Sequence, residues 1–172
     1  MTPPAVLYPP PIAPIVKTSG HFGDVVSKRA YFNKAVSVKV LEDVQVPLKE
    51  DEDSSVIARF QHEVNFLCNS KIVCNAKSQV LIKDQEVYDL VVEKGVGISS
   101  IFCYLDKLPS FELHGLGRTE KTFWREYSLK IPGVDCRFLE ALPSSLFDEN
   151  WLEKEPEEIS WDVEAKQEDQ LT

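Results

Sequence analysis

A single carboxylate interrupts an apolar stretch near the end of a predicted strand. Residues 138–142 read FLEAL, with Glu140 at the centre. Alternation along a strand puts Glu140 on the same face as Phe138 and Leu142, so its neighbours on that face are apolar. Buried acids are rare unless they are paired or functional, and burial would raise the pKa of this carboxyl. Glu140 is therefore a candidate proton donor or acceptor, and the alternative is a rim carboxylate that points at water.

Two basic side chains lie within other strand-like runs. In the run RFQHEVNFL, alternation places His62 on the apolar face with Phe60 and Val64. A histidine there is most often a satisfied core or pocket residue. Lys77 lies on the more polar face of the run IVCNAKSQVLI, either as a ligand-binding cation or as part of a solvated sheet face.

The sequence contains no motif for a nucleotide or a metal. The pairs Gly95-x-Gly97 and Gly115-x-Gly117 are too short to cradle a phosphate and are typical of turns. The three histidines lie far apart, and neither His-x-x-x-His nor Cys-x-x-Cys occurs. We therefore expect neither a bound metal nor an organic cofactor.

Composition predicts one globular domain without a membrane or nucleic-acid partner. The 172 residues are 43% apolar and 27% charged, and no apolar run approaches the roughly 20 residues of a membrane span. Of the net charge of −9, residues 153–172 carry −6 (eight acids against two lysines), which leaves −3 for the rest. No basic stripe with interleaved aromatics appears, so nucleic acid is not expected as a partner. Composition does not fix the oligomeric state.

The four cysteines are spread through apparent strands without the spacing of a zinc site or a disulfide framework. The first residues are rich in proline and lack a basic leader, so a signal peptide is not expected. Together these features predict reduced thiols in a cytoplasmic protein.

Apolar periodicity predicts an α+β domain, an antiparallel sheet of about six strands with a few short helices. A strand is expected at 34–46, where Val36, Val38 and Val40 share a half-buried face. Two more are expected at 56–68 and 71–82, on either side of the turn Asn69-Ser70. A last hairpin is expected over 122–143, with its turn at Pro132-Gly133. Helices are expected at 22–33 and at 84–94, where Asp84 can cap. Charged residues 48–55 and the stretch holding 114–117 are expected to be loops.

Three segments follow from these patterns. Residues 1–20 hold six of the eleven prolines and form an extended arm, which either stays weakly structured or packs a few apolar side chains on the body. Residues 21–150 form the domain. Residues 151–172 are an acidic tail, in which the alternating ISWDVEA either docks on the body or on a second subunit, or remains solvated.

From about Gly23 to Phe147 the chain resembles the chorismate lyases of ubiquinone biosynthesis. The resemblance lies in KAVSVKVLEDVQV, in the central hairpin HEVNFLCNSKIVCNAKS, and in the closing hairpin FWREYSLKIPGVDCRFLEALPSSLF. It implies an antiparallel sheet with a small ligand buried on one face beneath helical flaps. That family removes pyruvate from chorismate without a cofactor and leaves 4-hydroxybenzoate.

The same resemblance assigns roles to individual residues. Glu140 falls on the catalytic glutamate, and His62 falls on the arginine that binds a substrate carboxylate. In this chain the resemblance implies that Glu140 is the proton donor or acceptor and that His62 is its neutral polar partner in catalysis. Lys77 falls on the arginine of the second central strand. Gly97 and Ile98 fall near backbone amides that also bind carboxylate.

Two departures from the family pattern predict a changed substrate. His62 has neither the permanent charge nor the two-pronged donor of an arginine, and Ala76-Lys77-Ser78 replaces Gly-Arg-Thr. We therefore expect a small-molecule substrate less anionic than chorismate and a cofactor-independent elimination, isomerisation or cyclisation, including a pericyclic one, in a biosynthetic pathway. The alternatives are a true chorismate lyase and a non-catalytic small-molecule-binding protein of the same fold.

Overall fold

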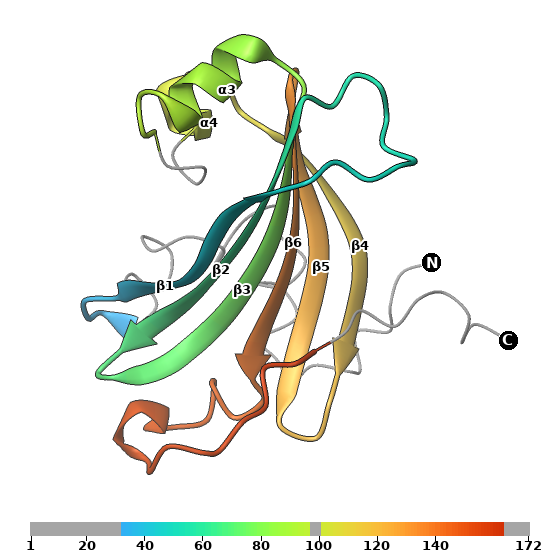
Figure 1. Ribbon diagram of the computed structural model, residues 1–172. Coiled ribbons are helices and arrows are strands. Elements are labelled where there is room, and N and C mark those ends of the chain that lie inside the picture. Colours follow the sequence, from blue (N-terminus) through green and yellow to red (C-terminus); the bar gives the residue numbers. More distant parts are fainter. Residues whose placement is uncertain (1–31, 97–100, 164–172) are drawn as a thin grey trace, which may run out of the picture.

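One antiparallel sheet makes up most of the described chain. The computed structural model describes residues 32–96 and 101–163, except for the side chain of Cys103. The strands are β1 (Ser37–Val46), β2 (Ala58–Cys68), β3 (Lys71–Ile82), β4 (Ser110–Arg118), β5 (Thr122–Ile131) and β6 (Val134–Pro143). Their order is β1-β2-β3-β6-β5-β4, so the sheet is open, with β1 and β4 at its edges (Figure 1).

Two tight hairpins, both expected from the sequence, build the middle of the sheet. Asn69 and Ser70 join β2 to β3 with φ values of 52° and 65°, the left-handed conformations that suit a two-residue hairpin turn. Pro132 and Gly133 join β5 to β6, and the φ of 89° at the second position explains the glycine. Antiparallel pairing of β3 with β6 then joins the two hairpins, although they lie far apart in the sequence.

The pairing register defines two faces of the sheet. One row of cross-strand partners consists of Val64, Ala76, Glu140, Arg125 and Leu116. We call the face to which these side chains point the Glu140 face. The next row consists of Asn65, Asn75, Ala141, Trp124 and Gly117. Because successive side chains alternate, this row points to the opposite side, which we call the Lys77 face after another residue on it.

Helices cover one end of the Glu140 face. Helix α3 (Gln85–Val92) begins where the Asp84 carboxylate accepts a hydrogen bond from the Glu86 amide at 2.8 Å, as the predicted cap requires. Its buried residues and those of the single turn α4 (Ile101–Tyr104) pack on strand residues that include Phe60, Val80 and Cys136. The two helices lie together at this end of the sheet (Figure 1). No helix in the described residues is long and apolar enough to cross a membrane.

A second apolar cluster covers the other end of the Glu140 face. It brings together buried residues of the sheet and of the segment that follows β6, among them Phe66, Phe123, Leu142, Leu146 and Trp151. Trp151 begins the short 3-10 helix η3 (Trp151–Glu153). The core of this face is thus in two parts, and Glu140 lies on β6 between them.

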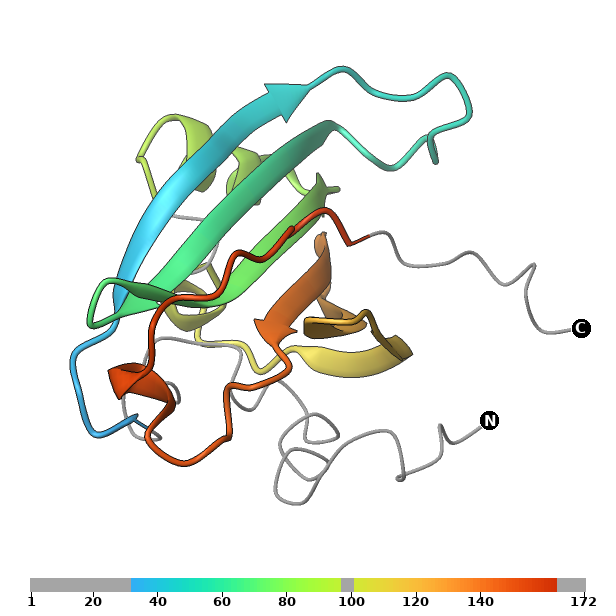
Figure 2. The ribbon, with the colours of Figure 1, turned by 90° about the horizontal axis from the view of Figure 1, so that it is seen from below.

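Part of the acidic tail packs across the Lys77 face, as Figure 2 shows. Val163 is buried, and Trp161 packs with it against Trp124, Ala141 and Leu139. The Lys77 ammonium donates to the backbone carbonyl of Trp161 at 3.2 Å. As far as residue 163, the structure shows the alternating segment ISWDVEA docked on the body, which is one of the alternatives expected from the sequence. The rest of the tail lies outside the described residues.

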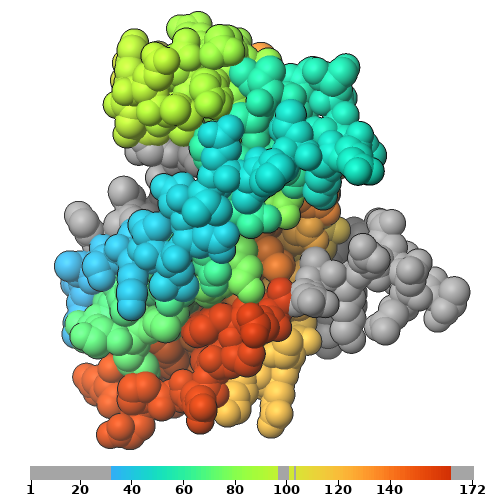
Figure 3. All heavy atoms as spheres, viewed as in Figure 1, coloured from blue at the N-terminus to red at the C-terminus, as the bar shows by residue number. Residues whose placement is uncertain are grey.

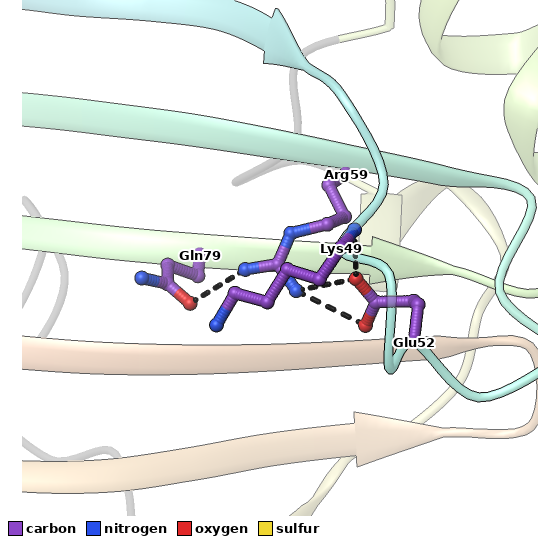
Figure 4. Close-up of polar contacts among 4 residues, drawn as sticks. All are labelled: Lys49, Glu52, Arg59 and Gln79. Atoms are coloured by element: carbon purple, nitrogen blue, oxygen red, sulfur yellow. Dashed lines mark hydrogen bonds and ion pairs between the residues drawn. The ribbon is translucent and has the colours of Figure 1, made fainter.

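A buried arginine on β2 binds the charged loop that follows β1 (Figure 4). Arg59 is 6% exposed, and its Nη1 donates to both carboxylate oxygens of Glu52, at 2.7 and 3.0 Å. Its Nη2 donates to the Gln79 side chain at 3.2 Å, and Glu52 also accepts from the Lys49 amide. The predicted loop is confirmed, but its acids are not all solvated, because one of them binds the sheet.

Three sequence-based expectations differ from the structure. The described part of the chain is the expected six-stranded antiparallel sheet, but it is mostly β rather than α+β, because α3 has eight residues and α4 is a single turn. The stretch around Gly115 and Gly117 is strand β4, not a loop, because these glycines leave room for the indole of Trp124 on β5. Strand β1 exists, but only Val36, just before it, is buried on the expected face; Val38 and Val40 are 44% and 55% exposed, because neither apolar cluster includes them. The proline-rich arm and all but the last two residues of the predicted helix 22–33 lie outside the described residues.

Candidate functional site

Glu140 is buried and paired, not a rim carboxylate. Only 2% of the residue is exposed to solvent. Arg125 Nε donates to one carboxylate oxygen at 2.8 Å, and Tyr127 Oη donates to the other at 2.5 Å. Arg125 and Tyr127 are each 2% exposed as well. We call these three residues the buried triad.

The closing hairpin itself positions the triad. Arg125 is the direct cross-strand partner of Glu140, and Tyr127 is the partner of Phe138. The Tyr127 ring stacks on Phe138, with centroids 5.1 Å apart, and on Phe111 of β4 at 5.3 Å. The Arg125 guanidinium also lies 4.6 Å from the Tyr127 ring centroid, so packing fixes the orientation of both donors.

The two donors beside Glu140 are both suited to a charged carboxylate. Burial and the neighbouring Glu140 charge raise the pKa of Tyr127 well above its usual value, so its hydroxyl remains a donor. Burial disfavours the charged form of Arg125, but the Glu140 carboxylate outweighs that effect and the pKa of the guanidinium is raised. A permanent cation and a neutral donor thus both stabilise the ionised form of Glu140.

His62 lies on the Glu140 face but is not the cation beside the acid. His62 pairs in register with Ser78 on β3, and Ser78 pairs with Phe138 on β6. Two strand spacings of about 5 Å each therefore separate His62 from β6, where its row meets Phe138 rather than Glu140. Among the described residues its ring makes no hydrogen bond or ion pair. Arg125 occupies the position beside Glu140 that sequence reasoning assigned to His62.

The structure does not bring Lys77 to Glu140. Lys77 lies on the opposite face, where its ammonium binds the Trp161 carbonyl and lies 3.8 Å from the Asp162 carboxylate. Gly97 and Ile98, the expected carboxylate-binding backbone, lie outside the described residues.

Sequence reasoning missed Arg125 and Tyr127, although a signal for both exists. Alternation in FWREYSLK places Phe123, Arg125 and Tyr127 on one face, so a charged residue again interrupts an apolar row. Counting outward from the two-residue turn at Pro132-Gly133 pairs residues whose numbers sum to 265, and Arg125 with Glu140 is such a pair. The turn position alone therefore predicts this contact.

The described residues contain no cluster of three or more histidine, cysteine or acidic side chains that could bind a metal ion. Cys68, Cys74 and Cys136 are buried free thiols, without the exposed, electropositive surroundings of a reactive cysteine.

Cys136 should make the fold sensitive to alkali. Burial, with a smaller contribution from the Asp135 charge, raises the pKa of its thiol from 9.0 to about 12. A group whose folded pKa is raised contributes stability that is complete below pH 9 and is lost as the pH rises towards 12, at about 1.4 kcal/mol per pH unit. We expect titration of this thiol to lower the free energy of unfolding by about 2 kcal/mol between pH 8 and pH 10.5. Urea unfolding of the wild type and of Cys136→Ala at both pH values measures this term, and equal pH dependence in the two proteins would contradict it.

No family model and no curated protein matches this chain.

Proposed function

We propose that this protein is a cofactor-independent enzyme that binds a small biosynthetic intermediate on the Glu140 face and catalyses its elimination, isomerisation or cyclisation. The observation that supports this proposal most is the burial of an ionised carboxylate between two apolar clusters, with a cation and a neutral donor fixed on its oxygens. Such pre-organised acids are typical of sites that transfer protons. The proposal also draws on the resemblance of both hairpins to chorismate lyases.

The proposed chemistry begins with Glu140 as the base. Its carboxylate accepts a proton from an acidic carbon of the substrate and becomes a carboxylic acid. Glu140 then returns the proton to another carbon in an isomerisation, or to the leaving group in an elimination. Neither sequence changes the oxidation state of the substrate, so neither requires a redox partner. Arg125 and Tyr127 position the carboxylate, and Arg125 balances its charge before the transfer.

The charges of the triad favour a substrate with few negative charges. Arg125 and Glu140 sum to zero formal charge, and the guanidinium already binds the carboxylate at 2.8 Å. A substrate carboxylate would have to compete with Glu140 for Arg125. Chorismate carries two carboxylates, and neither His62 nor Lys77, the residues that fall on the two arginines of the family, lies beside Glu140. A substrate less anionic than chorismate therefore fits this face better.

One observation favours a second candidate, a binding protein without catalysis. Both oxygens of Glu140 already accept hydrogen bonds from the protein, so the carboxylate is satisfied without a ligand. A buried pair of this kind can also serve only to specify the pairing of β5 with β6. The two candidates differ in one measurable property, the turnover of a substrate.

Glu140→Asp provides the test, because it keeps the charge and withdraws the carboxylate by about 1.5 Å, the length of one carbon–carbon bond. The wild type and the variant are each incubated with a metabolite extract from cells that make the protein, and the extract is followed by mass spectrometry. We expect the wild type to consume one metabolite and to form a product that is isomeric with it or is its elimination product. The variant should do so about 100-fold more slowly, because the base no longer reaches the proton.

Each outcome of this experiment assigns the function. Consumption of no metabolite by the wild type would refute the enzyme, and retention of one unchanged metabolite through gel filtration would then support the binding protein. Equal turnover by wild type and variant would refute the role of Glu140. In a separate incubation with chorismate, release of 4-hydroxybenzoate and pyruvate would identify a true chorismate lyase instead.

A further inference from the structure

Strand β1 exposes an unusual amount of apolar surface along an open sheet edge. Val38, Val40, Leu41 and Val44 are between 44% and 55% exposed, all within ten residues. Among the described residues, β1 pairs only with β2, so the backbone groups on its outer edge have no partner strand. The space-filling view shows β1 at the surface of the molecule (Figure 3). Long apolar edges of this kind are templates for pairing with another chain.

The second edge of the sheet differs from β1. In β4 the apolar residues Phe111, Leu113 and Leu116 are only partly exposed, and Phe111 stacks on Tyr127 of the buried triad. The exposed apolar side chains of β1 therefore do not follow from its position at an edge alone.

The charges on β1 are arranged so that the strand complements itself. A bulge between Val40 and Glu42 shifts the register, so Lys39 and Glu42 are opposite Asn65 and Glu63, which lie on the same face of β2. A two-fold axis through the middle of β1 would place Lys39 of each copy opposite Glu42 of the second copy. The same register brings Val40 of each copy next to the bulge residue Leu41 of the second copy, so apolar residues lie between the two oppositely charged pairs.

A change of register removes this complementarity. Moving one copy by two residues in one direction places Lys39 opposite Val44 and Glu42 opposite Leu41 of the second copy. In the other direction Lys39 is opposite Val40 and Glu42 is opposite Ser37, so neither shift pairs opposite charges. A shift by one residue sends the two side chains of each pair to opposite faces of the sheet. Bulges and charges usually protect an edge strand against pairing with other chains. In β1 they still permit one register with a second copy, the one that places Lys39 opposite Glu42.

We propose that β1 is the interface of a homodimer, in which two antiparallel β1 strands join two six-stranded sheets into one continuous sheet. The partner is a second copy of this chain, related by a two-fold axis perpendicular to the sheet. One strand pair is smaller than a standard interface, so the dissociation constant should be on the order of 10 µM.

A charge exchange tests this interface directly. Sedimentation velocity between 1 and 200 µM should show a concentration-dependent dimer for the wild type. Lys39→Glu and Glu42→Lys should each raise the dissociation constant about tenfold, because each places two like-charged pairs across the axis. The double variant K39E/E42K restores opposite charges and should return to within about threefold of the wild type. Lys94→Glu, an exposed change beyond helix α3, serves as the control and should leave the equilibrium unchanged.

The outcomes that overturn the proposal are equally defined. A wild type that stays monomeric up to 200 µM refutes it, whether the edge is free, covered by another part of the chain or reserved for a different protein. A dimer that neither single variant weakens uses another surface. A double variant no stronger than the single variants refutes the proposed register, because recovery requires Lys39 and Glu42 to be opposite each other.

Discussion

Arg125→Met is expected to destabilise the fold by about 3–5 kcal/mol, the largest effect of any single substitution considered in this protein. The change removes the cation and leaves the Glu140 carboxylate, 2% exposed, without the charge that balances it. A buried charge that loses its partner cannot regain its water shell, so the cost is much larger than the net worth of the pair. Urea unfolding at pH 7, followed by tryptophan fluorescence, measures the change.

Two further variants separate this effect from a loss of packing. The double variant R125M/E140L removes both charges and should recover most of the lost stability, because two apolar side chains fit among the surrounding clusters. Arg137→Met breaks a pair with Glu126 on the same two strands, but the Arg137 side chain is 56% exposed. We expect a loss below about 1 kcal/mol there. A double variant that is less stable than Arg125→Met would mean that the two charges are not coupled.

Gly117→Ala should be the second most damaging change, with a loss of about 3 kcal/mol. A Cβ atom at this position would overlap three atoms of the Trp124 indole. Trp124 is 8% exposed and packs against Ala141 and the docked tail, so the ring has little freedom to move away. Thermal unfolding should show a lower Tm together with a changed tryptophan fluorescence maximum.

Gly115→Ala is the matched control for this prediction. It lies two residues earlier on the same strand, and its Cβ would be 3.5 Å from the same indole, an ordinary contact distance. The two substitutions have the same effect on backbone freedom, so their difference reports the overlap alone. Equal losses in the two variants would show that Trp124 does not restrict Gly117.

The local features of this fold were predictable because short-range chemistry specifies them. The turns Asn69-Ser70 and Pro132-Gly133 marked both central hairpins, and Asp84 marked the start of the helix. The face of Glu140 followed from strand alternation. In each case the pattern depends on neighbours within a few residues, whose geometry hardly varies with the rest of the fold.

Other features required contacts between distant segments. The alternation in β1 predicted a buried face, but burial depends on what lies above the strand, and nothing in the run itself reveals an edge position. The pair Gly115 and Gly117 suggested a loop, whereas the close approach of Trp124 makes glycine suitable for a strand there. The alternating end of the acidic tail was compatible with both docking and solvation until its contacts with Leu139 and Ala141 were known.

The same distinction holds for the candidate site. The sequence by itself determined that an acid stands in an apolar row of β6, and the turn at Pro132-Gly133 determined its partner, Arg125. Only the tertiary structure decided that Lys77 lies on the face opposite to Glu140 and that His62 lies two strands from Glu140. Both facts depend on how β3 pairs with β6. Hairpin pairing is set by a turn of two residues, whereas pairing between hairpins depends on the side chains of the whole sheet.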